Sequence, residues 1–329
     1  MDTVLSGIRP TGHLHLGNYY GAVRSFVKMQ DAYDCYFFIA DWHSLTTHPT
    51  PTDIQQSVRT ILAEYLACGL DPDKATIYVQ SDVPETLELY LYFNMNAYLG
   101  ELERVTTFKE KVRQNPNNVN AGLFTYPTLM AADILQHRAK FVPVGKDQEQ
   151  NMEMARKCAQ RFNYMYKADV FPIPQNYYFG KEAVKVPGLD GSGKMGKSTG
   201  NCLYLCEDDK TLRKKVMKAV TDNGPQSPNS PKPEVIQNLF TLLAIVSQPD
   251  TCRYFEEKWN DCSLRYGDMK KQLAEDIVQT VAPIRERIEQ FAADTQLLDR
   301  IAARGAEKAR ASAAETLRLV RQTIGFRVY

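Results

Sequence analysis

The first eighty residues alternate between short apolar runs and longer amphipathic ones. Residues 3–5, 34–39 and 75–79 are mostly apolar, and their lengths are typical of buried strands in a parallel sheet. Residues 22–27 and 52–68 instead place apolar side chains at helical spacing, with Thr52 as the expected N-cap of the second helix. This alternation predicts half of a doubly wound α/β fold.

The rest of the chain is mostly helical in pattern. Residues 84–137 predict a helical insertion with a joint near 100–104, and a strand at 141–144 is followed by a helix that reaches about residue 166. Beyond the proline-rich break at 224–233 we expect three or four helices, the last over 306–324. We therefore expect a catalytic domain over residues 1–200 and a smaller C-terminal all-helical domain over 201–329.

Charge is almost balanced along the chain. The 329 residues contain 40 Lys and Arg against 39 Asp and Glu, for a net charge of +1. This balance excludes a general basic coat for nucleic acid, so any RNA contact must use a local patch. Within residues 285–329, basic side chains fit either phosphate contacts or a solvated helix surface; they are Arg304, Lys308, Arg310, Arg318 and Arg321.

Cysteine usage indicates a reducing compartment. The chain has seven cysteines, and Cys35 and Cys68 lie in apolar runs, as buried reduced thiols do. Cys202 and Cys206 have no second pair at zinc-ligand spacing, so we expect no metal held by the protein itself. Asp2 follows Met1 without a signal peptide, and no apolar run approaches a membrane span, so we expect a cytoplasmic protein without a membrane partner.

Residues 6–21 form a glycine-bearing turn between the first strand and the first helix. Gly12 and Gly17 permit close backbone approach, and the helix start offers unpaired N–H groups to an anion. His15 and Asn18 lie three residues apart, so both side chains can face the same pocket. The turn favours a phosphate site, although a purely structural turn fits the same residues equally well.

A second glycine-rich stretch covers residues 188–198. It contains four glycines, two serines and the lysines Lys194 and Lys197. Such a stretch is able to wrap an anion, or it is a solvated linker, which is the better interpretation of this stretch taken alone.

The two glycine-bearing stretches together resemble the signatures of a known family. Residues 15–18 and 194–198 resemble the HIGH and KMSKS motifs of the class I aminoacyl-tRNA synthetases. Further stretches, almost from end to end, resemble the bacterial tryptophanyl branch of that family; they are 6–10, 100–104, 108–111, 129–135, 142–148 and 219–222. Three positions depart from the general pattern: Asn18 replaces the final histidine, as it does in the tryptophan branch, Gly196 replaces the central serine, and Arg9 stands where many relatives carry glutamine.

This resemblance implies a Rossmann-like catalytic domain that activates L-tryptophan with ATP and Mg²⁺ and transfers it to tRNA(Trp), working as a homodimer. It implies catalytic roles for His15, Asn18, Lys194 and Lys197. It implies ATP contacts at Arg9, Pro10, Thr11, Gly17, Asn18, Gly145, Lys146, Asp147, Val186, Lys194, Met195, Gly196, Lys197 and Ser198. It implies tryptophan contacts at Gly7, His43, Tyr126, Met130, Asp133 and Gln148, with tRNA anticodon binding by the helical domain.

Asp133 carries the proposed amino-acid choice. It lies among apolar residues of a predicted helix, where periodicity alone favours a packing carboxylate paired with an arginine. The resemblance instead favours an acceptor for the indole N–H, which is a donor only. Three alternatives stay open: a tyrosyl-tRNA synthetase, a small-molecule nucleotidylyltransferase, and a non-catalytic RNA-binding relative.

Overall fold

The computed structural model describes residues 1–47, 50–114, 116–145, 148–177, 185–191 and 193–328, without the side chains of residues 47, 107, 114 and 198. A five-stranded sheet of order β3-β2-β1-β4-β5 lies at its centre, and each neighbouring pair is parallel. The strands are β1 Thr3–Ile8, β2 Asp34–Ile39, β3 Thr76–Val79, β4 Phe141–Pro143 and β5 Gln175–Tyr177. The predicted parallel α/β fold is confirmed, but β5 escaped prediction because its short, polar sequence lacks a strand pattern.

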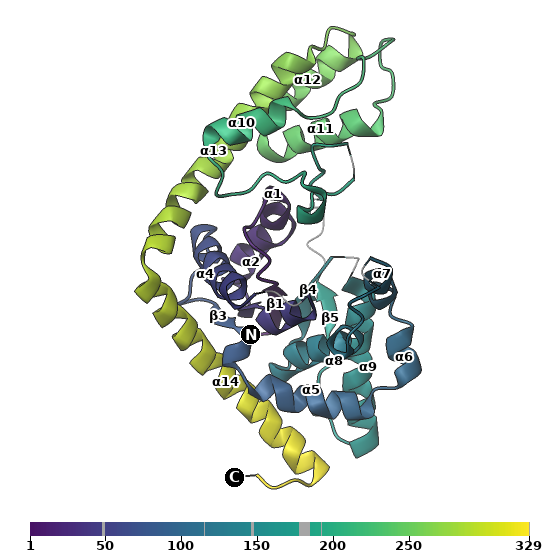
Figure 1. The fold of residues 1–329 in the computed structure, drawn as a ribbon, viewed down its shortest axis with the longest axis vertical. Coiled ribbons are helices and arrows are strands. Elements are labelled where there is room, and N and C mark those ends of the chain that lie inside the picture. Colours follow the sequence, from purple (N-terminus) through teal and green to yellow (C-terminus); the bar gives the residue numbers. More distant parts are fainter. Residues whose placement is uncertain (48–49, 115, 146–147, 178–184, 192, 329) are drawn as a thin grey trace.

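Helices cover both faces of the sheet (Figure 1). In the first half of the chain they are α1 Leu16–Asn18, α2 Arg24–Met29, α3 Asp41–Ser44, α4 Pro51–Ala67, α5 Glu85–Asn96, α6 Leu99–Glu103, α7 Thr106–Gln114, α8 Ala121–Gln136 and α9 Glu149–Tyr166. Later in the chain they are α10 Asp209–Met217, α11 Glu234–Val246, α12 Pro249–Asn260, α13 Tyr266–Ala293 and α14 Thr295–Ile324.

Alternating side chains of the strands enter two separate cores. Val4, Phe37 and Ile77 pack with α2, α4 and α13 on one face, whereas their neighbours Leu5 and Phe38 pack with α5, α8 and α9 on the other. Both faces are buried because parallel strands are covered by their own crossover helices, which is why the strands read as continuous apolar runs.

Three expected boundaries differ in the structure. Thr50, not Thr52, is the N-cap of α4, and its hydroxyl accepts the Asp53 N–H at 3.2 Å. The stretch 100–104 lies largely within α6, and the chain breaks at either side of this short helix. The last helix begins at Thr295 rather than at 306. Its first three turns or so were missed because its N-cap, Asp294, follows directly on the apolar pattern of α13.

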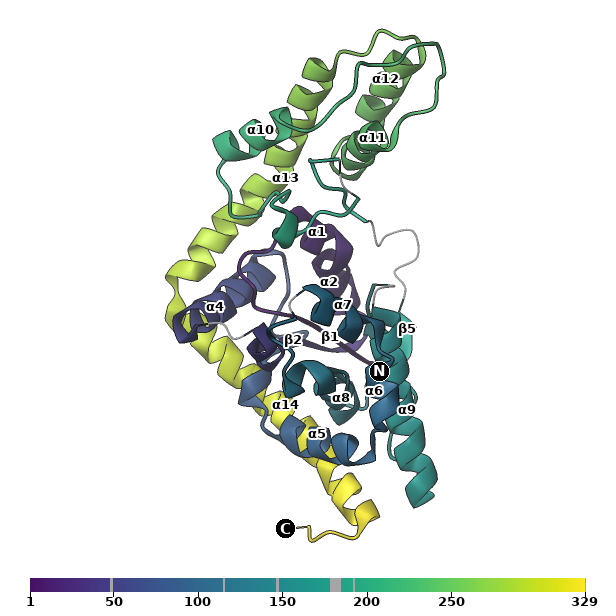
Figure 2. The ribbon, with the colours of Figure 1, turned by 45° about the vertical axis from the view of Figure 1, so that its right-hand side comes forward.

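α14 returns to the sheet and packs along the edge strand β3 (Figures 1 and 2). A Cβ on Gly305 would lie 1.7 Å from the Ile77 carbonyl oxygen, so only glycine lets the helix approach this strand so closely. Two basic side chains of α14 form ion pairs, Arg304 with Asp73 of the loop before β3 at 2.8 Å and Arg321 with Glu88 of α5 at 2.7 Å. Arg304 thus links the helix to the segment that leads into the edge strand, and Arg321 links it to α5.

Candidate functional site

The carboxyl ends of four parallel strands carry the polar segments of the site. β1 leads into the turn before α1, β2 into α3, β3 into Gln80–Asp82, and β4 into the loop at Gly145. The order reverses between β1 and β4, and ligands of open α/β sheets bind in the crevice at such a reversal. The fold thus brings the predicted phosphate turn and the residues predicted to bind the amino acid to the same side of the sheet, at the carboxyl ends of its strands.

His15 lies buried at the start of α1, with 5% of its surface exposed. Its backbone N–H donates to Asn18 Oδ1 at 3.1 Å, which fixes the turn, while its ring nitrogen Nδ1 is buried without a hydrogen-bond partner among the residues that the structure describes. A Cβ on Gly17 would approach this ring to 2.8 Å, so a glycine is needed where the imidazole lies over the backbone. A buried nitrogen without a partner is costly unless a ligand satisfies it.

The two signature segments are in direct contact. Lys197 Nζ donates to the Gly12 carbonyl oxygen at 3.0 Å and to the Thr11 carbonyl oxygen at 3.3 Å. The segment that follows Lys197 forms an isolated antiparallel bridge between His15 and Tyr204 (green ribbon beside α1 in Figure 2). We call residues 194–203, which carry Lys194 and Lys197, the lysine loop. This loop and the turn before α1 are 185 residues apart in sequence, and together they form one surface.

Backbone bonds hold both ends of the lysine loop. The Met195 N–H donates to the Val186 carbonyl at 2.9 Å, and the Leu16 N–H donates to the Leu203 carbonyl at 2.9 Å. The Gly196 N–H donates to Asn201 Oδ1 at 2.8 Å, closing the loop on itself. Met195 is buried, whereas Lys194 is exposed, so the loop is anchored by its apolar side chain and presents its charge to solvent.

Burial disfavours positive charge on several side chains of this surface. Burial, followed by the charges of Lys197 and Lys194, lowers the pKa of His15 to about 4, so its imidazole is neutral at pH 7. Burial also lowers the pKa of Lys197, and burial together with Arg9 lowers the pKa of Lys111 to about 8. An anion placed among these groups would relieve each of these penalties.

Two residues of this surface were given no role from the sequence. Lys111 lies on α7 with Nζ 4.3 Å from the centre of the Tyr126 ring; it falls in the stretch 108–111, which carried the resemblance but no assignment. Glu64 lies on α4, fully buried, and its carboxylate accepts the Leu14 N–H at 2.6 Å. The signal that could have found Glu64 is a carboxylate on the otherwise apolar face of its helix.

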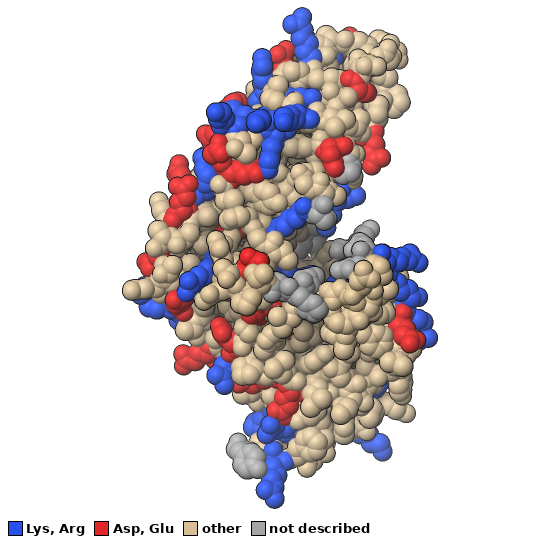
Figure 3. Space-filling model, in the orientation of Figure 1, with Lys and Arg blue, Asp and Glu red and all other residues tan. Residues whose placement is uncertain are grey.

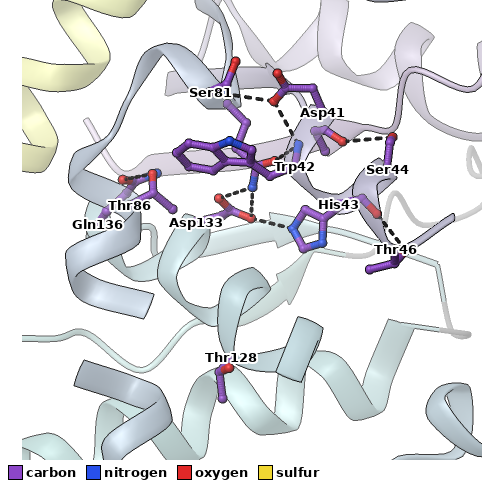
Figure 4. Close-up of polar contacts among 12 residues, drawn as sticks. Asp41, Trp42, His43, Ser44, Thr46, Ser81, Thr86, Thr128, Asp133 and Gln136 are labelled. Carbon is purple, nitrogen blue, oxygen red and sulfur yellow. Dashed lines mark hydrogen bonds and ion pairs between the residues drawn. The ribbon is translucent and has the colours of Figure 1, made fainter. Parts of the chain in front are cut away.

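Asp133 on α8 is 1% exposed and bonded on both oxygens (Figure 4). His43 Nε2 lies 2.8 Å from Oδ2, and Gln80 Nε2 donates to Oδ1 at 2.8 Å and to Oδ2 at 3.0 Å. The arginine partner suggested by periodicity is wrong, because a histidine from α3 takes that place. Burial raises the pKa of Asp133, and the bonds from His43 and Gln80 oppose this rise.

Tyr126 and Gln148 are joined through one amide. The Tyr126 hydroxyl donates to Asn151 Oδ1 at 3.0 Å, and Asn151 Nδ2 donates to Gln148 Oε1 at 2.8 Å. Met130, on the same helix as Asp133, is partly buried against the core, and a Cβ on Gly7 would lie 2.6 Å from the Phe38 ring. Asn151 is thus a further polar residue of this region that the sequence did not single out.

Comparison with known proteins identifies the family. The family profile of class I tRNA synthetases for tryptophan and tyrosine matches residues 2–282. A tryptophan–tRNA ligase of Porphyromonas gingivalis is 69% identical over 327 residues, covering 99% of this chain and 100% of that protein. This chain belongs to the bacterial-type tryptophanyl-tRNA synthetases of class I.

Two further relatives agree with this assignment. A tryptophan–tRNA ligase of Clostridium perfringens is 39% identical to the synthetase, covering 98% of this chain and 97% of that protein. The crystal structure of tryptophanyl-tRNA synthetase from Campylobacter jejuni complexed with ADP and tryptophan is 33% identical, with a TM-score of 0.88, covering 98% of this chain and 100% of that chain.

The remaining residues predicted to contact ATP differ in burial, and some of them lie outside the described residues. Pro10 and Val186 are buried, whereas Thr11 and Gly145 are exposed at the strand ends. Lys146, Asp147 and the side chain of Ser198 lie outside the described residues, so their predicted ATP contacts stay predictions. No helix in the described ranges of the synthetase combines the length and apolarity needed to cross a bilayer.

Proposed function

We propose that this chain joins L-tryptophan to ATP, forming tryptophanyl-adenylate and pyrophosphate, and then transfers the tryptophanyl group to tRNA(Trp). The observation that carries this proposal is the contact between Lys197 and the turn before α1, on the same sheet edge as the buried Asp133. Lys197 would supply positive charge for the phosphates, and Asp133 would supply a shielded acceptor for an aromatic N–H.

The phosphate chemistry rests on positioning and charge. The tryptophan carboxylate attacks the α-phosphorus in line, the bond to the pyrophosphate oxygen breaks, and negative charge accumulates on the leaving group. Lys194 and Lys197 meet this charge, and neutral His15 donates to the α-phosphate side together with Asn18. Lys111 adds a third cation close to Arg9.

Mg²⁺ enters this scheme as part of the nucleotide. In the described part of the surface, Lys194, Lys197, His15 and Asn18 are cations or neutral donors rather than the oxygen ligands that Mg²⁺ prefers. The ion would therefore take phosphate oxygens and water as ligands. Gly145 and Val186 are proposed to face the adenosine, with Asp147 assigned to the ribose hydroxyls by resemblance alone.

The indole N–H is proposed to donate to Asp133. Gln80 and His43 occupy three of the roughly four acceptor positions of the carboxylate, so one acceptor position stays available for the substrate. Tyr126 and Gln148 are proposed to hold the α-amino group, with Met130 and Gly7 lining the pocket. A competing amino acid whose side chain has no N–H at this place would leave the buried Asp133 acceptor unpaired, and its binding would be disfavoured.

Pyrophosphate exchange tests this function directly. The full-length protein is incubated with ATP, labelled pyrophosphate and tryptophan, tyrosine or phenylalanine in turn. We expect rapid exchange with tryptophan alone. Exchange that is equal or faster with tyrosine would overturn the proposed substrate, and exchange with none of the three would favour a non-catalytic relative.

A basic part of the protein surface is proposed to bind tRNA. Lys and Arg gather over α10, which contains Lys210, Arg213, Lys214 and Lys215 (Figure 3). This patch is the part of the helical domain that suits an RNA backbone. Charging of tRNA places the protein with the translation machinery, in the cytoplasm.

The apolar side chains exposed on α5 and α6 suit a second copy of the chain. Leu91, Met95 and Leu99 are 51%, 78% and 64% exposed, and Tyr98 lies between them. A patch of this kind on a single protomer indicates an interface. Light scattering of the purified protein should give the dimer mass and, for Met95→Glu, the monomer mass; a monomer at micromolar concentration in the wild type would refute the dimer.

A further inference from the structure

Beside the phosphate surface, three different metal-binding side chains converge from three segments. His13 belongs to the turn before α1, Glu64 to the middle of α4, and Cys206 to the segment that follows the lysine loop. One ring nitrogen of His13, one carboxylate oxygen of Glu64 and the sulfur of Cys206 all lie within 4.8 Å of one another. Their positions, far apart in sequence, explain why ligand spacing along the chain gave no sign of them.

The cluster is preorganised by the buried carboxylate. Glu64 is 0% exposed, and its Oε2 is fixed by the Leu14 N–H at 2.6 Å. Its other oxygen, Oε1, lies 2.7 Å from His13 Nδ1. Cys206 is a free thiol with partial exposure, and the neighbouring Leu205 N–H is bonded to the Leu14 carbonyl at 3.0 Å, so the sulfur is carried by an anchored backbone.

The cluster also favours positive charge at its centre. The Glu64 carboxylate oxygen Oε1 lies 2.7 Å from His13 Nδ1, and the three ligand atoms lie within 4.8 Å of one another. A divalent cation held between them would face a carboxylate and, once imidazole and thiol have lost their protons, two further ligands.

We propose that His13, Glu64 and Cys206 form a binding site for Zn²⁺, with a water molecule as the fourth ligand. A donor set of one nitrogen, one oxygen and one sulfur suits this borderline-soft ion and disfavours Mg²⁺, which prefers oxygen. The side chain of His13 is 50% exposed, so the ion reaches the site from solution and the fourth position faces water.

The ion would join the signature turn, α4 and the segment after the lysine loop. Lys197 bonds to the Gly12 carbonyl at 3.0 Å, one residue before His13, so the lysine loop touches the segment that carries the cluster. Zn²⁺ bound to His13 and Cys206 would hold the loop's end against the turn. Zinc binding is therefore coupled to the lysine loop, whether or not the proposed reaction takes place there.

Cobalt spectroscopy tests the site without any activity measurement. Full-length protein, reduced and freed of metal with chelator, is titrated with Co²⁺, which gives near-ultraviolet sulfur-to-cobalt absorption when a thiolate is a ligand. We expect this absorption to saturate at one equivalent and to disappear when Zn²⁺ is added.

Variants decide which side chains are ligands. Cys206→Ser should abolish the sulfur-to-cobalt absorption, and His13→Asn should weaken Co²⁺ binding at least about tenfold. Cys262→Ser, which changes an exposed cysteine outside the cluster, is the matched control and should leave the titration unchanged. Both cluster variants alter side chains that are partly exposed, and their melting temperatures should match that of the wild type.

Absence of the absorption in the wild type, its persistence in Cys206→Ser, or its equal loss in Cys262→Ser would overturn the zinc site. None of these results touches the pyrophosphate exchange assay, so failure of the site and failure of the proposed function are separable.

Discussion

The surroundings of Asp133 and of His15 differ in how their polar groups are satisfied. The Asp133 carboxylate is bonded to His43 and Gln80 within the protein, whereas the His15 ring has a buried nitrogen with no partner among the described residues and two lysine charges beside it. On the function proposed above, the amino-acid pocket would therefore be formed before substrate arrives. On the proposed phosphate side, an anion would relieve the unfavourable charge, so binding energy would be available there for the chemical step.

The largest effect should come from removing charge on the phosphate side. Lys197→Ala is expected to lower kcat for pyrophosphate exchange about 100-fold or more, because one preorganised donor to the leaving phosphates is lost. Tryptophan binding, measured by calorimetry, should stay near the wild-type value. The exposed Lys271→Ala on α13 is the charge-matched control, and unchanged exchange in Lys197→Ala would remove the proposed role.

A change in the amino-acid pocket should give the opposite kinetic pattern. Asp133→Ala is expected to raise the KM for tryptophan about 10- to 100-fold, the cost of a hydrogen bond to a charged acceptor, with little change in the KM for ATP. Asp133→Asn keeps one acceptor oxygen, so its KM for tryptophan should lie between those of the wild type and Asp133→Ala. Equal increases in both KM values would count against a pocket separate from the phosphate surface.

A smaller effect is expected from disturbing only the His15 ring. In Gly17→Ala the new Cβ would lie 2.8 Å from that ring, so the imidazole must shift. We expect about a tenfold loss of kcat/KM for ATP, in line with the sensitivity of reactions to small misplacements. Gly267→Ala, where the added Cβ meets nothing within 4 Å, is the control; wild-type kinetics in Gly17→Ala would show that the ring position is not critical.

The smallest effect concerns stability against pH. The pKa of His15 is lowered to about 4 in the folded protein, against about 6.5 when unfolded, so the unfolded state binds more protons between these values. His15 thus contributes full stability above pH 6.5, and this is lost as the pH falls towards 4. Between pH 7 and 4, unfolding in urea should show a loss about 1–2 kcal/mol smaller in His15→Asn than in the wild type. Identical losses would mean that His15 is not a neutral, buried imidazole.

The sequence predicted most of the fold, and it predicted that residues 15–18 and 194–198 lie together. Strand and helix periodicity located β1 to β4, because each is an apolar run that ends at a turn, and the family signatures named His15 and Lys197. The contact between the two depends on pairing across 185 residues, which periodicity does not encode. The resemblance, not the pattern, supplied that expectation.

The polar partners were the part that the sequence could not supply. Gln80 and Glu64 act on residues about fifty positions away, each from a segment whose own pattern is only that of a strand end or a helix. Which side chains meet Asp133 depends on the tertiary arrangement of β2, β3 and α8. Hence periodicity alone suggested an arginine partner for Asp133, which is wrong, and it suggested no role for Glu64.

The two fastened ends of the lysine loop have a mechanical consequence. Between Met195 and Leu203, Gly200 adopts a left-handed backbone with φ of 67°, and Gly196 precedes the short turn Lys197–Thr199. That turn lies between two glycines, on a segment only a few residues long. The entropy of bringing the ends of this segment together is lost when the chain folds rather than when ATP arrives. An anion that binds beside Lys197 would therefore meet a loop whose ends are already held in place.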